Sequence, residues 1–155
     1  LKGSLDSDII SVGVFVDSPE EEILNLFNDG VIEIAQLHGG ESEQYILDLK
    51  KKTNNELKII NAIEMNQEVN LSEYNDSNSD YLLLDSGKGS GKTFDWSLIG
   101  KDLDKEFFLA GGINSENVVQ AIDEFSPFAV DLSSSLETDG VKDENKIKEI
   151  MEIIR

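Results

Sequence analysis

The sequence predicts a parallel α/β fold made of six consecutive strand–helix units. Six short apolar runs, rich in β-branched and aromatic residues, are spread along the 155 residues, and their first residues lie 20 to 26 positions apart. Most runs are continuous rather than alternating, which is typical of strands buried on both faces of a parallel sheet. The runs are Val12–Val16, Ile32–Leu37, Leu57–Ile63, Tyr81–Leu84, Phe107–Ala110 and Phe128–Leu132.

Several segments between these runs carry helix signals. Ser18-Pro19-Glu20-Glu21 offers an N-cap, a proline at the first helical position and the Glu of a capping box. A further helix is expected behind the polar residues Asn114 and Ser115. In contrast, the Asn- and Ser-rich segment Asn66–Ser79 is expected to be a loop with at most one helical turn.

The last expected helix follows Asp143, which is suited to cap it. Its apolar residues recur at helical spacing and are expected to form a buried face. They are Ile147, Ile150, Met151 and Ile154.

The length of the units leaves two architectures open. At about 24 residues each, eight units would need roughly 195 residues, near the lower bound of about 200 for a closed (β/α)8 barrel. This chain holds six units, so the residues alone allow either a compact open sheet or a barrel without its first or last two units. A single domain over residues 1–155 is expected in both cases. The chain begins with Leu1 rather than Met, which suggests that an N-terminal part is missing.

Composition excludes several classes of function. Thirteen Lys and Arg against 32 Asp and Glu give a net charge of −19, which disfavours nucleic acid and anionic lipid as partners. The absence of Cys rules out disulfides, thiolate metal sites and cysteine nucleophiles within these residues. No apolar run approaches 18 residues, and no signal peptide is recognisable. We therefore expect a cytoplasmic protein without a membrane span.

Small and polar residues follow the predicted strands, at the edge where parallel α/β folds bind ligands. Gly111-Gly112, just before a helix, is a candidate phosphate site because glycines allow close backbone approach. An isolated Gly-Gly pair is also compatible with a simple tight turn. The adjacent loop Ser133–Ser135 favours the phosphate interpretation, since barrel phosphate sites are often built from the last two strand–helix loops.

Three titratable residues are also expected at this edge. Asp85 closes the strand Tyr81–Leu84 and is suited to act as a general acid, although capping the following glycine turn is equally compatible with its position. Asp131 has the same two interpretations. His38 is the only histidine, and it has no partners at a spacing that suggests a metal site. It is as compatible with a structural role as with substrate contact.

The segment Ser86–Thr93 raises an alternative function. Gly91-Lys92-Thr93 fits the end of a nucleotide-binding P-loop, but Ser86 stands where its first glycine belongs. The residues after Thr93 also do not continue as a helix should. A non-catalytic phosphate- or nucleotide-binding domain that uses the 86–93 glycine–lysine loop remains the alternative hypothesis.

The strand ends resemble one family closely, the phosphoribosylanthranilate isomerases of tryptophan biosynthesis. Each matching motif is weak alone, but the motifs occur in order along nearly the whole chain. They are Val12–Val16, Gln36-Leu37-His38-Gly39, Leu83–Ser86, Gly91–Trp96, Leu109–Ile113, Asn117-Val118, Val130–Ser134, Leu136-Glu137 and Lys142-Asp143.

The resemblance implies a (β/α)8 TIM barrel of which this chain carries units three to eight. It also implies an Amadori rearrangement of a phosphosugar, N-(5-phosphoribosyl)anthranilate, without a metal or organic cofactor. By resemblance, Asp85 is the general acid that opens the ribose ring. Gly111, Gly112 and Ser133–Ser135 hold the phosphate, and His38, Asp131 and Glu137 line or support the pocket. A monomer or a homodimer is compatible with the resemblance.

Departures from the family pattern bear on activity. The family's general base is a cysteine in its first strand, and the anthranilate carboxylate is bound by an arginine after the second strand; neither has a counterpart in this chain. The chain alone is therefore expected to be inactive. Ser135 also replaces a usual glycine, and its Cβ would hinder the phosphate if the backbone there required a positive φ.

Overall fold

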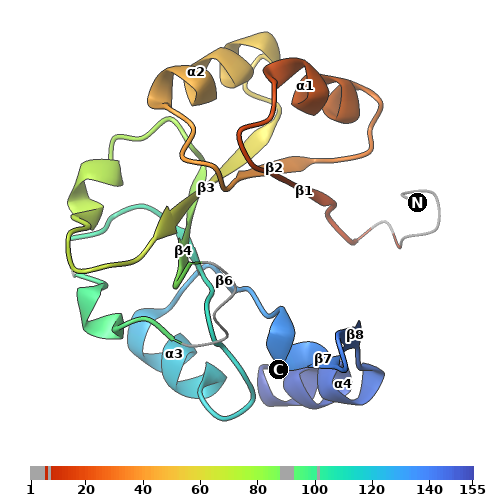
Figure 1. Ribbon diagram of the computed structural model, residues 1–155, viewed down its shortest axis with the longest axis vertical. Helices are drawn as coiled ribbons and strands as arrows, with labels where there is room; N and C mark the ends of the chain where they lie inside the picture. The colour runs from red at the N-terminus through yellow and green to blue at the C-terminus, as the bar shows by residue number, and fades with distance from the viewer. Residues whose placement is uncertain (1–5, 7, 88–92, 101) are drawn as a thin grey trace. The chain divides into compact units, whose positions relative to one another are not determined.

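The computed structural model describes residue 6 and residues 8–87, 93–100 and 102–155. Contacts divide the chain into two compact units. Unit 1 comprises Leu1–Ile63 and Asp76–Leu82, and unit 2 comprises Glu64–Asn75 and Leu83–Arg155. Along most of the chain, strands alternate with α-helices or short 3-10 turns (Figure 1).

All six predicted strands are present, and they follow one another in the order β1-β2-β3-β4-β5-β6. The pairs β1·β2, β2·β3 and β5·β6 are parallel, in agreement with the continuous apolar runs. The strands are β1 (Val12–Phe15), β2 (Ile34–Leu37), β3 (Lys58–Glu64), β4 (Tyr81–Asp85), β5 (Phe107–Leu109) and β6 (Ala129–Val130).

In unit 1, two helices pack on strands β1 to β3. Helix α1 (Glu20–Asn28) and helix α2 (Glu43–Lys52) lie side by side (Figure 1). Ile23 of α1 and Ile46 of α2 are completely buried with Leu37 of β2. Removal of such side chains from water supplies the main driving force for folding of this unit.

Unit 1 also contains a partly buried ion cluster. The Lys50 ammonium donates to the Asp80 carboxylate at 2.5 Å and to the Leu57 carbonyl oxygen at 3.1 Å. Lys58 and the Ile59 N–H donate to the same carboxylate at 2.8 and 2.9 Å. Burial alone would raise the pKa of Asp80, but these hydrogen bonds outweigh it and hold that pKa below its usual value.

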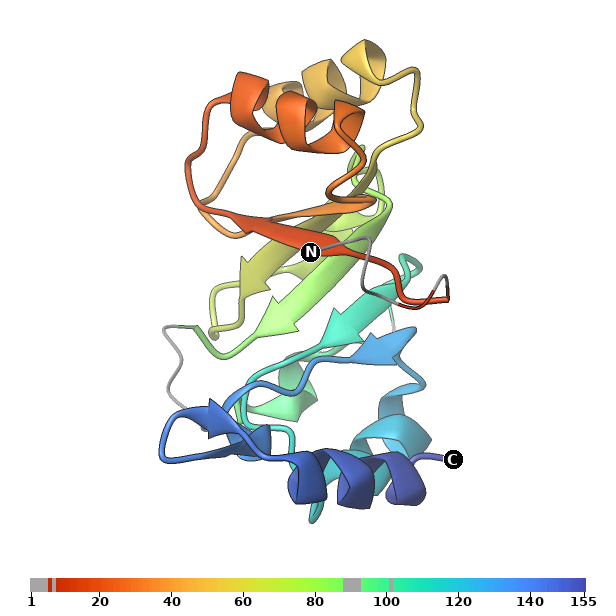
Figure 2. The same cartoon turned by 90° about the vertical axis from the view of Figure 1, so that its right-hand side faces the viewer.

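Unit 2 contains the end of β4, strands β5 and β6, and the elements that surround them. Helix α3 (Val118–Phe125) precedes β6, and helix α4 (Glu144–Ile153) ends the chain. Between β6 and α4, a short 3-10 turn leads into a two-stranded hairpin (Figure 2). These three elements are η4 (Ser134–Leu136), β7 (Glu137–Thr138) and β8 (Val141–Lys142), and the 3-10 turns η2 (Leu71–Tyr74) and η3 (Trp96–Leu98) complete the unit.

Several local predictions are confirmed and two are wrong. Asp143 caps α4 by accepting a hydrogen bond from the Asn145 N–H, and Asn66–Ser79 contains one helical turn, as expected. Ser18 does not cap α1, because the helix begins one residue later and its N-cap is Pro19.

The expected buried face of α4 is also only partly buried. Of its residues Ile150 is 3% exposed, whereas Ile147 and Met151 are 37% and 41% exposed. The helix contacts the rest of unit 2 mainly through η4. The buried part of this helix is therefore centred on Ile150. Helical spacing predicted which residues share one side, but not that most of that side stays partly exposed.

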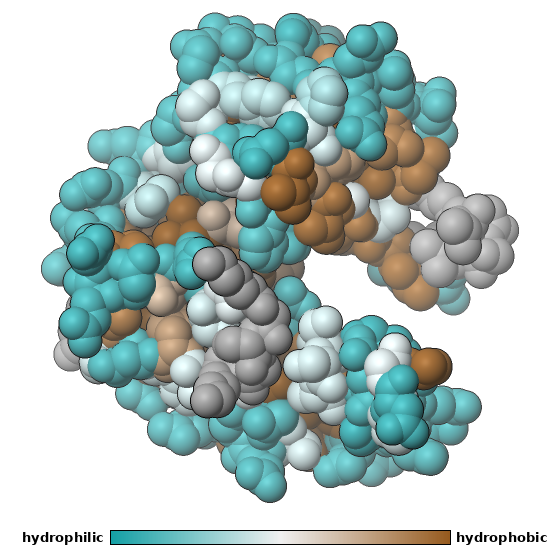
Figure 3. All heavy atoms as spheres, viewed as in Figure 1, coloured by the Kyte–Doolittle hydropathy of each residue, from teal (hydrophilic) through white to brown (hydrophobic). Residues whose placement is uncertain are grey.

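One side of β1 is exposed and apolar (Figure 3, brown). Val12, Val14 and Val16 are 43%, 61% and 63% exposed, whereas Phe15 on the opposite side of the strand is buried. Side chains alternate between the two faces of a strand. Only one face of β1 is therefore covered within unit 1.

Candidate active site

In unit 2, Asp85 ends β4 and Gly111 lies two residues after the end of β5. The Ala110 N–H donates to the Leu84 carbonyl oxygen at 2.9 Å, which aligns the carboxyl ends of β4 and β5. Gly111 has a φ of +75°, and a Cβ at this position would come within 2.6 Å of the Ser86 hydroxyl oxygen and 2.7 Å of its backbone nitrogen. The close approach and the left-handed backbone both require glycine. Asp85 and Gly111, predicted as site residues, are thus brought together.

The turn after Gly111 is held by two asparagines at the start of α3. Gly112 also has a left-handed φ of +71°. Its carbonyl oxygen accepts hydrogen bonds from the side-chain amides of Asn114, at 3.2 Å, and Asn117, at 3.1 Å. The Asn117 side-chain oxygen in turn accepts the Asn114 N–H at 2.9 Å. The glycine pair is therefore a fixed turn, and its conformation is determined by side chains that follow it.

Strand β6 places Asp131 at the same edge. The Asp131 N–H donates to the Leu109 carbonyl oxygen at 2.9 Å, and the Asp131 side chain is exposed. The 133–135 loop follows directly and enters η4. Ser135 lies in this 3-10 turn and is not among the non-glycine residues with a positive φ, so a side chain at position 135 is compatible with the backbone.

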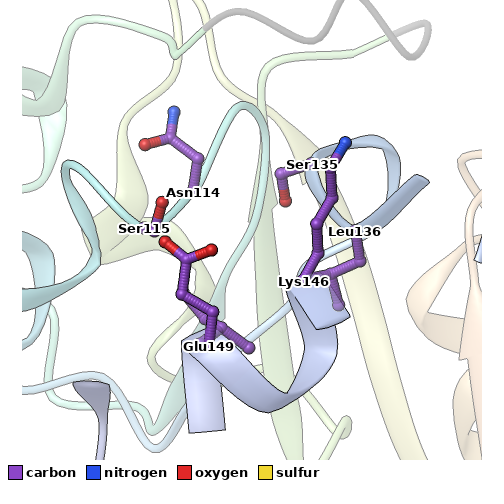
Figure 4. A pocket seen from close by; sticks show the side chains of 7 residues that line it. Asn114, Ser115, Ser135, Leu136, Lys146 and Glu149 are labelled. Carbon is purple, nitrogen blue, oxygen red and sulfur yellow. The ribbon is translucent and has the colours of Figure 1, made fainter. Parts of the chain in front are cut away.

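A cavity of about 110 Å³ lies beside η4 (Figure 4). The Ser135 side chain points into it, and its buried hydroxyl oxygen has no hydrogen-bond partner among the described residues. Lys146 and Glu149 of α4 lie along one side of the cavity, and Asn114 and Ser115, which precede α3, lie along another. The lining residues are Asn114, Ser115, Ser135, Leu136, Lys146, Glu149 and Ile150.

Glu137 is held by two lysines that follow it in sequence. The Lys142 ammonium lies 2.7 Å from the Glu137 carboxylate and 2.9 Å from the Ser133 carbonyl oxygen. The Lys146 ammonium donates to the Glu137 carbonyl oxygen at 2.5 Å. The two lysines therefore fix the segment that follows the 133–135 loop.

The hairpin that carries Lys142 was not expected from the sequence. Its turn residues Asp139 and Gly140 have φ angles of +53° and +77°, as a tight two-residue hairpin turn requires. The Asp-Gly pair is the signal that could have revealed it. The strands on each side contain only two residues, which is too short for a recognisable alternation.

His38 belongs to unit 1, where it follows β2. Its N–H donates to the Phe15 carbonyl oxygen at 2.8 Å, and its ring Nδ1 lies 3.4 Å from the side-chain amide of Gln36. The nearby Glu41 carboxylate accepts hydrogen bonds from the N–H groups of Asp17 and Gly39, both at 3.0 Å. Glu41 therefore links the loops after β1 and β2, a role that sequence reasoning missed.

The remaining candidate, the 86–93 loop, is described only at its ends. Residues 88–92 lie outside the described residues. After Thr93 the chain forms the three-residue turn η3, capped by the Asp95 carboxylate, and the helix that a P-loop requires is not found in residues 93–98. Trp96 of η3 packs edge-on against Phe125 of α3, with ring centroids 5.7 Å apart.

Two further observations concern the described residues only. None of their helices is both long enough and apolar enough to cross a membrane. Within the same residues, no group of three or more His, Asp or Glu side chains is arranged to hold a metal ion.

Comparison with known proteins identifies the family. The family model for N-(5'-phosphoribosyl)anthranilate (PRA) isomerase matches residues 5–153. The N-(5'-phosphoribosyl)anthranilate isomerase of Endomicrobium trichonymphae is 42% identical over 97% of this chain and 75% of its own length. That of Listeria monocytogenes is 37% identical over 96% of this chain and 74% of its own. The chain thus spans about three quarters of these relatives.

Solved structures agree with the sequence comparison. The isomerase from Thermus thermophilus superimposes with a TM-score of 0.86 at 30% identity, covering 99% of this chain and 76% of that one. A phosphoribosylanthranilate isomerase in complex with reduced 1-(o-carboxyphenylamino)-1-deoxyribulose 5-phosphate gives 0.79 at 32% identity, covering 97% and 73%. The α/β fold of the TIM-barrel type is thus shared with these proteins, and the chain belongs to the N-(5'-phosphoribosyl)anthranilate isomerase family.

Proposed function

We propose that this protein catalyses the Amadori rearrangement of N-(5-phosphoribosyl)anthranilate to 1-(carboxyphenylamino)-1-deoxyribulose 5-phosphate in tryptophan biosynthesis. The observation that carries the proposal is the match to the isomerase family over residues 5–153. It is supported by the arrangement in unit 2, where Asp85 ends β4 and where Gly111 and Asp131 follow the ends of β5 and β6. We further propose that the enzyme works without a cofactor in the cytoplasm, as a monomer or a homodimer.

In the proposed reaction, Asp85 acts first. Its carboxyl group donates a proton to the ribose ring oxygen while the bond from that oxygen to C1 breaks and the nitrogen lone pair forms a C1=N bond. This leaves a hydroxyl group, the Asp85 carboxylate and a protonated imine between C1 and the anthranilate nitrogen. A base then removes the proton from C2, and the resulting enol becomes the ketone as C1 gains a proton. In the family pattern the base is a cysteine of the first strand, and these 155 residues contain none.

The substrate phosphate is proposed to bind at the ends of β5 and β6. Gly111, Gly112 and the 133–135 loop supply backbone N–H groups there, and successive N–H groups in a turn form a concave site for an anion. Asp131 and Glu137 are proposed to line or support the pocket. His38 of unit 1 is proposed to have a similar supporting role.

The test is an assay of anthranilate fluorescence, which changes as phosphoribosylanthranilate is consumed. The chain should be assayed alone and after fusion to the first two strand–helix units of the Endomicrobium trichonymphae relative, which would supply the base. We expect turnover from the fusion and negligible turnover from the chain alone. A folded fusion protein that turns over no substrate would contradict the proposed function.

Asp85→Asn in the active fusion tests the role of the acid. Positioned general acids contribute about 10²- to 10⁴-fold to rate, so kcat should fall by about that factor. Asp123→Asn, an exposed position on α3, is the matched control and should leave kcat unchanged. Wild-type kcat in Asp85→Asn, with an unchanged unfolding curve, would refute the acid role.

A further inference from the structure

Two backbone carbonyl groups next to the proposed phosphate site are held in the same way. The Gly112 carbonyl oxygen accepts the side-chain amides of Asn114 and Asn117. The Ser133 carbonyl oxygen accepts the Lys142 ammonium at 2.9 Å and the Leu136 N–H at 3.1 Å. In both loops, side chains of later residues thus bind a carbonyl oxygen, and the N–H group of the same peptide belongs to Ile113 in one loop and to Ser134 in the other.

The direction of each carbonyl fixes the direction of the next N–H. In a trans peptide the C=O group and the N–H group of the following residue point in opposite directions, because the six atoms of the peptide lie in one plane. The Ile113 N–H therefore points away from Asn114 and Asn117, and the Ser134 N–H points away from Lys142. Rotation of either peptide would cost the hydrogen bonds to its carbonyl oxygen.

Lys142 is in turn held in place. Its ammonium also pairs with the Glu137 carboxylate at 2.7 Å, across the hairpin pair Glu137–Lys142. The next residue, Asp143, donates its N–H to the Leu136 carbonyl oxygen at 2.8 Å and caps α4. The hairpin thus connects the 133–135 loop to α4, and Lys142 is the side chain that reaches back to the loop.

We propose that Asn117 and Lys142 are positioning residues for the substrate phosphate, because they hold the carbonyl oxygens of Gly112 and Ser133 and so direct the N–H groups of Ile113 and Ser134 toward it. The inference rests on the proposed function. Neither residue needs to touch the phosphate. Lys142 also places a positive charge near an anion in a chain whose net charge is −19.

The first experiment is a titration of the chain with inorganic phosphate, followed by phosphorus NMR. Lys142→Met keeps the length of the side chain but removes its donors, and it should weaken phosphate binding about tenfold, as expected for loss of a hydrogen bond that involves a charged group. Lys142→Arg restores donors and charge and should bind within about threefold of wild type.

Lys148→Met controls for charge. Lys148 is exposed on α4 and pairs only with Glu144 among its described contacts, so this variant changes net charge by the same amount and should alter binding less than about twofold. Equal weakening in Lys142→Met and Lys148→Met would overturn the positioning role in favour of general electrostatic attraction.

Asn117→Asp tests the second loop with an isosteric change. It keeps the acceptor for the Asn114 N–H, removes the donor to the Gly112 carbonyl oxygen, and should weaken phosphate binding about tenfold. Gln120→Glu adds the same charge on the same helix and should change binding less than about twofold.

In the active fusion, the variants should raise KM much more than they lower kcat, because the phosphate lies away from the reacting carbon. An effect on the unfolding curve without an effect on phosphate affinity or KM would overturn the inference and leave the proposed function intact. Absence of phosphate binding by the unchanged chain, together with an inactive fusion, would overturn both.

Discussion

The strand ends of the two units use their backbone polar groups in opposite ways. In unit 1, the loops after β1 and β2 are closed by a carboxylate, because Glu41 accepts the N–H groups of Asp17 and Gly39. In unit 2, by contrast, Asn114, Asn117 and Lys142 donate hydrogen bonds to the carbonyl oxygens of Gly112 and Ser133.

The two units repeat one strand–helix architecture, but we interpret the strand ends of unit 1 as structural and those of unit 2 as the proposed ligand-binding edge. A carboxylate that accepts backbone N–H groups occupies the position that an anionic ligand would need, and it adds negative charge there. Donors that bind carbonyl groups leave the N–H groups available for such a ligand. The comparison therefore supports the proposal that the phosphate binds in unit 2, and it gives Glu41 of unit 1 a structural role.

The largest expected effect on stability comes from substitution of Gly111 in unit 2. Gly111→Ala forces a Cβ against Ser86 and also imposes a left-handed φ on alanine, so we expect a loss of about 2–5 kcal/mol in the free energy of unfolding. Gly40 in unit 1 also has a left-handed φ, of +90°, but an added Cβ there would meet nothing within 4 Å. Gly40→Ala should therefore lower the free energy of unfolding by only about 1–2 kcal/mol. Urea unfolding at neutral pH measures both. Equal losses would show that Ser86 moves aside freely.

The next largest loss of stability is expected from substitutions in the ion cluster of unit 1. Lys50→Met removes a nearly buried ammonium and leaves the Asp80 carboxylate less well paired, so we expect a loss of about 2–3 kcal/mol. Lys58 pairs with the same carboxylate but its side chain is 52% exposed, and Lys58→Met should cost less than about 1 kcal/mol. Similar urea midpoints for the two variants would contradict the role given to burial.

The same cluster predicts a pH dependence. The pKa of Asp80 is lower in the folded chain than in the unfolded one, where it is about 3.9. The stability that the cluster supplies is therefore complete above the unfolded pKa and is lost as pH falls through the folded pKa. The difference in free energy of unfolding between wild type and Asp80→Asn should be constant above about pH 5 and shrink below it. A constant difference down to acid unfolding would argue against the lowered pKa.

The smallest effect concerns Glu41 and its neighbour Tyr45. Burial, and then the charge of Glu41, raise the pKa of Tyr45 to about 12, and its hydroxyl donates to the Ser18 carbonyl oxygen at 2.7 Å. Glu41→Gln should lower the pKa of Tyr45 and cost about 1 kcal/mol of stability. Ultraviolet absorbance of tyrosinate, with Tyr45→Phe as the reference, follows the titration. Glu56→Gln should leave that titration unchanged, and an equal shift in both variants would refute a specific effect of Glu41.

Strand positions could be predicted well, because short apolar runs rich in β-branched residues are recognisable without knowledge of tertiary contacts. The burial of both faces was predicted less well, since one side of β1 is exposed. The positions of Asp85, Gly111 and Asp131 near the carboxyl ends of strands could be predicted for the same reason, whereas their roles stay proposals. Lys142 and Glu41 were missed as supporting residues because their partners are set by the three-dimensional packing of loops. The face of α4 was overestimated because helical spacing shows which residues share a side, and not how much of that side is covered.

The exposed side of β1 has a practical consequence for handling the protein. At neutral pH, the large negative charge keeps copies of the chain apart even though Val12, Val14 and Val16 are open to solvent. Near the isoelectric point of about 4.2 that repulsion disappears, whereas the apolar strand is unchanged. An acidic purification step should therefore precipitate the protein through this strand, and a mildly alkaline buffer of low ionic strength should keep it dispersed.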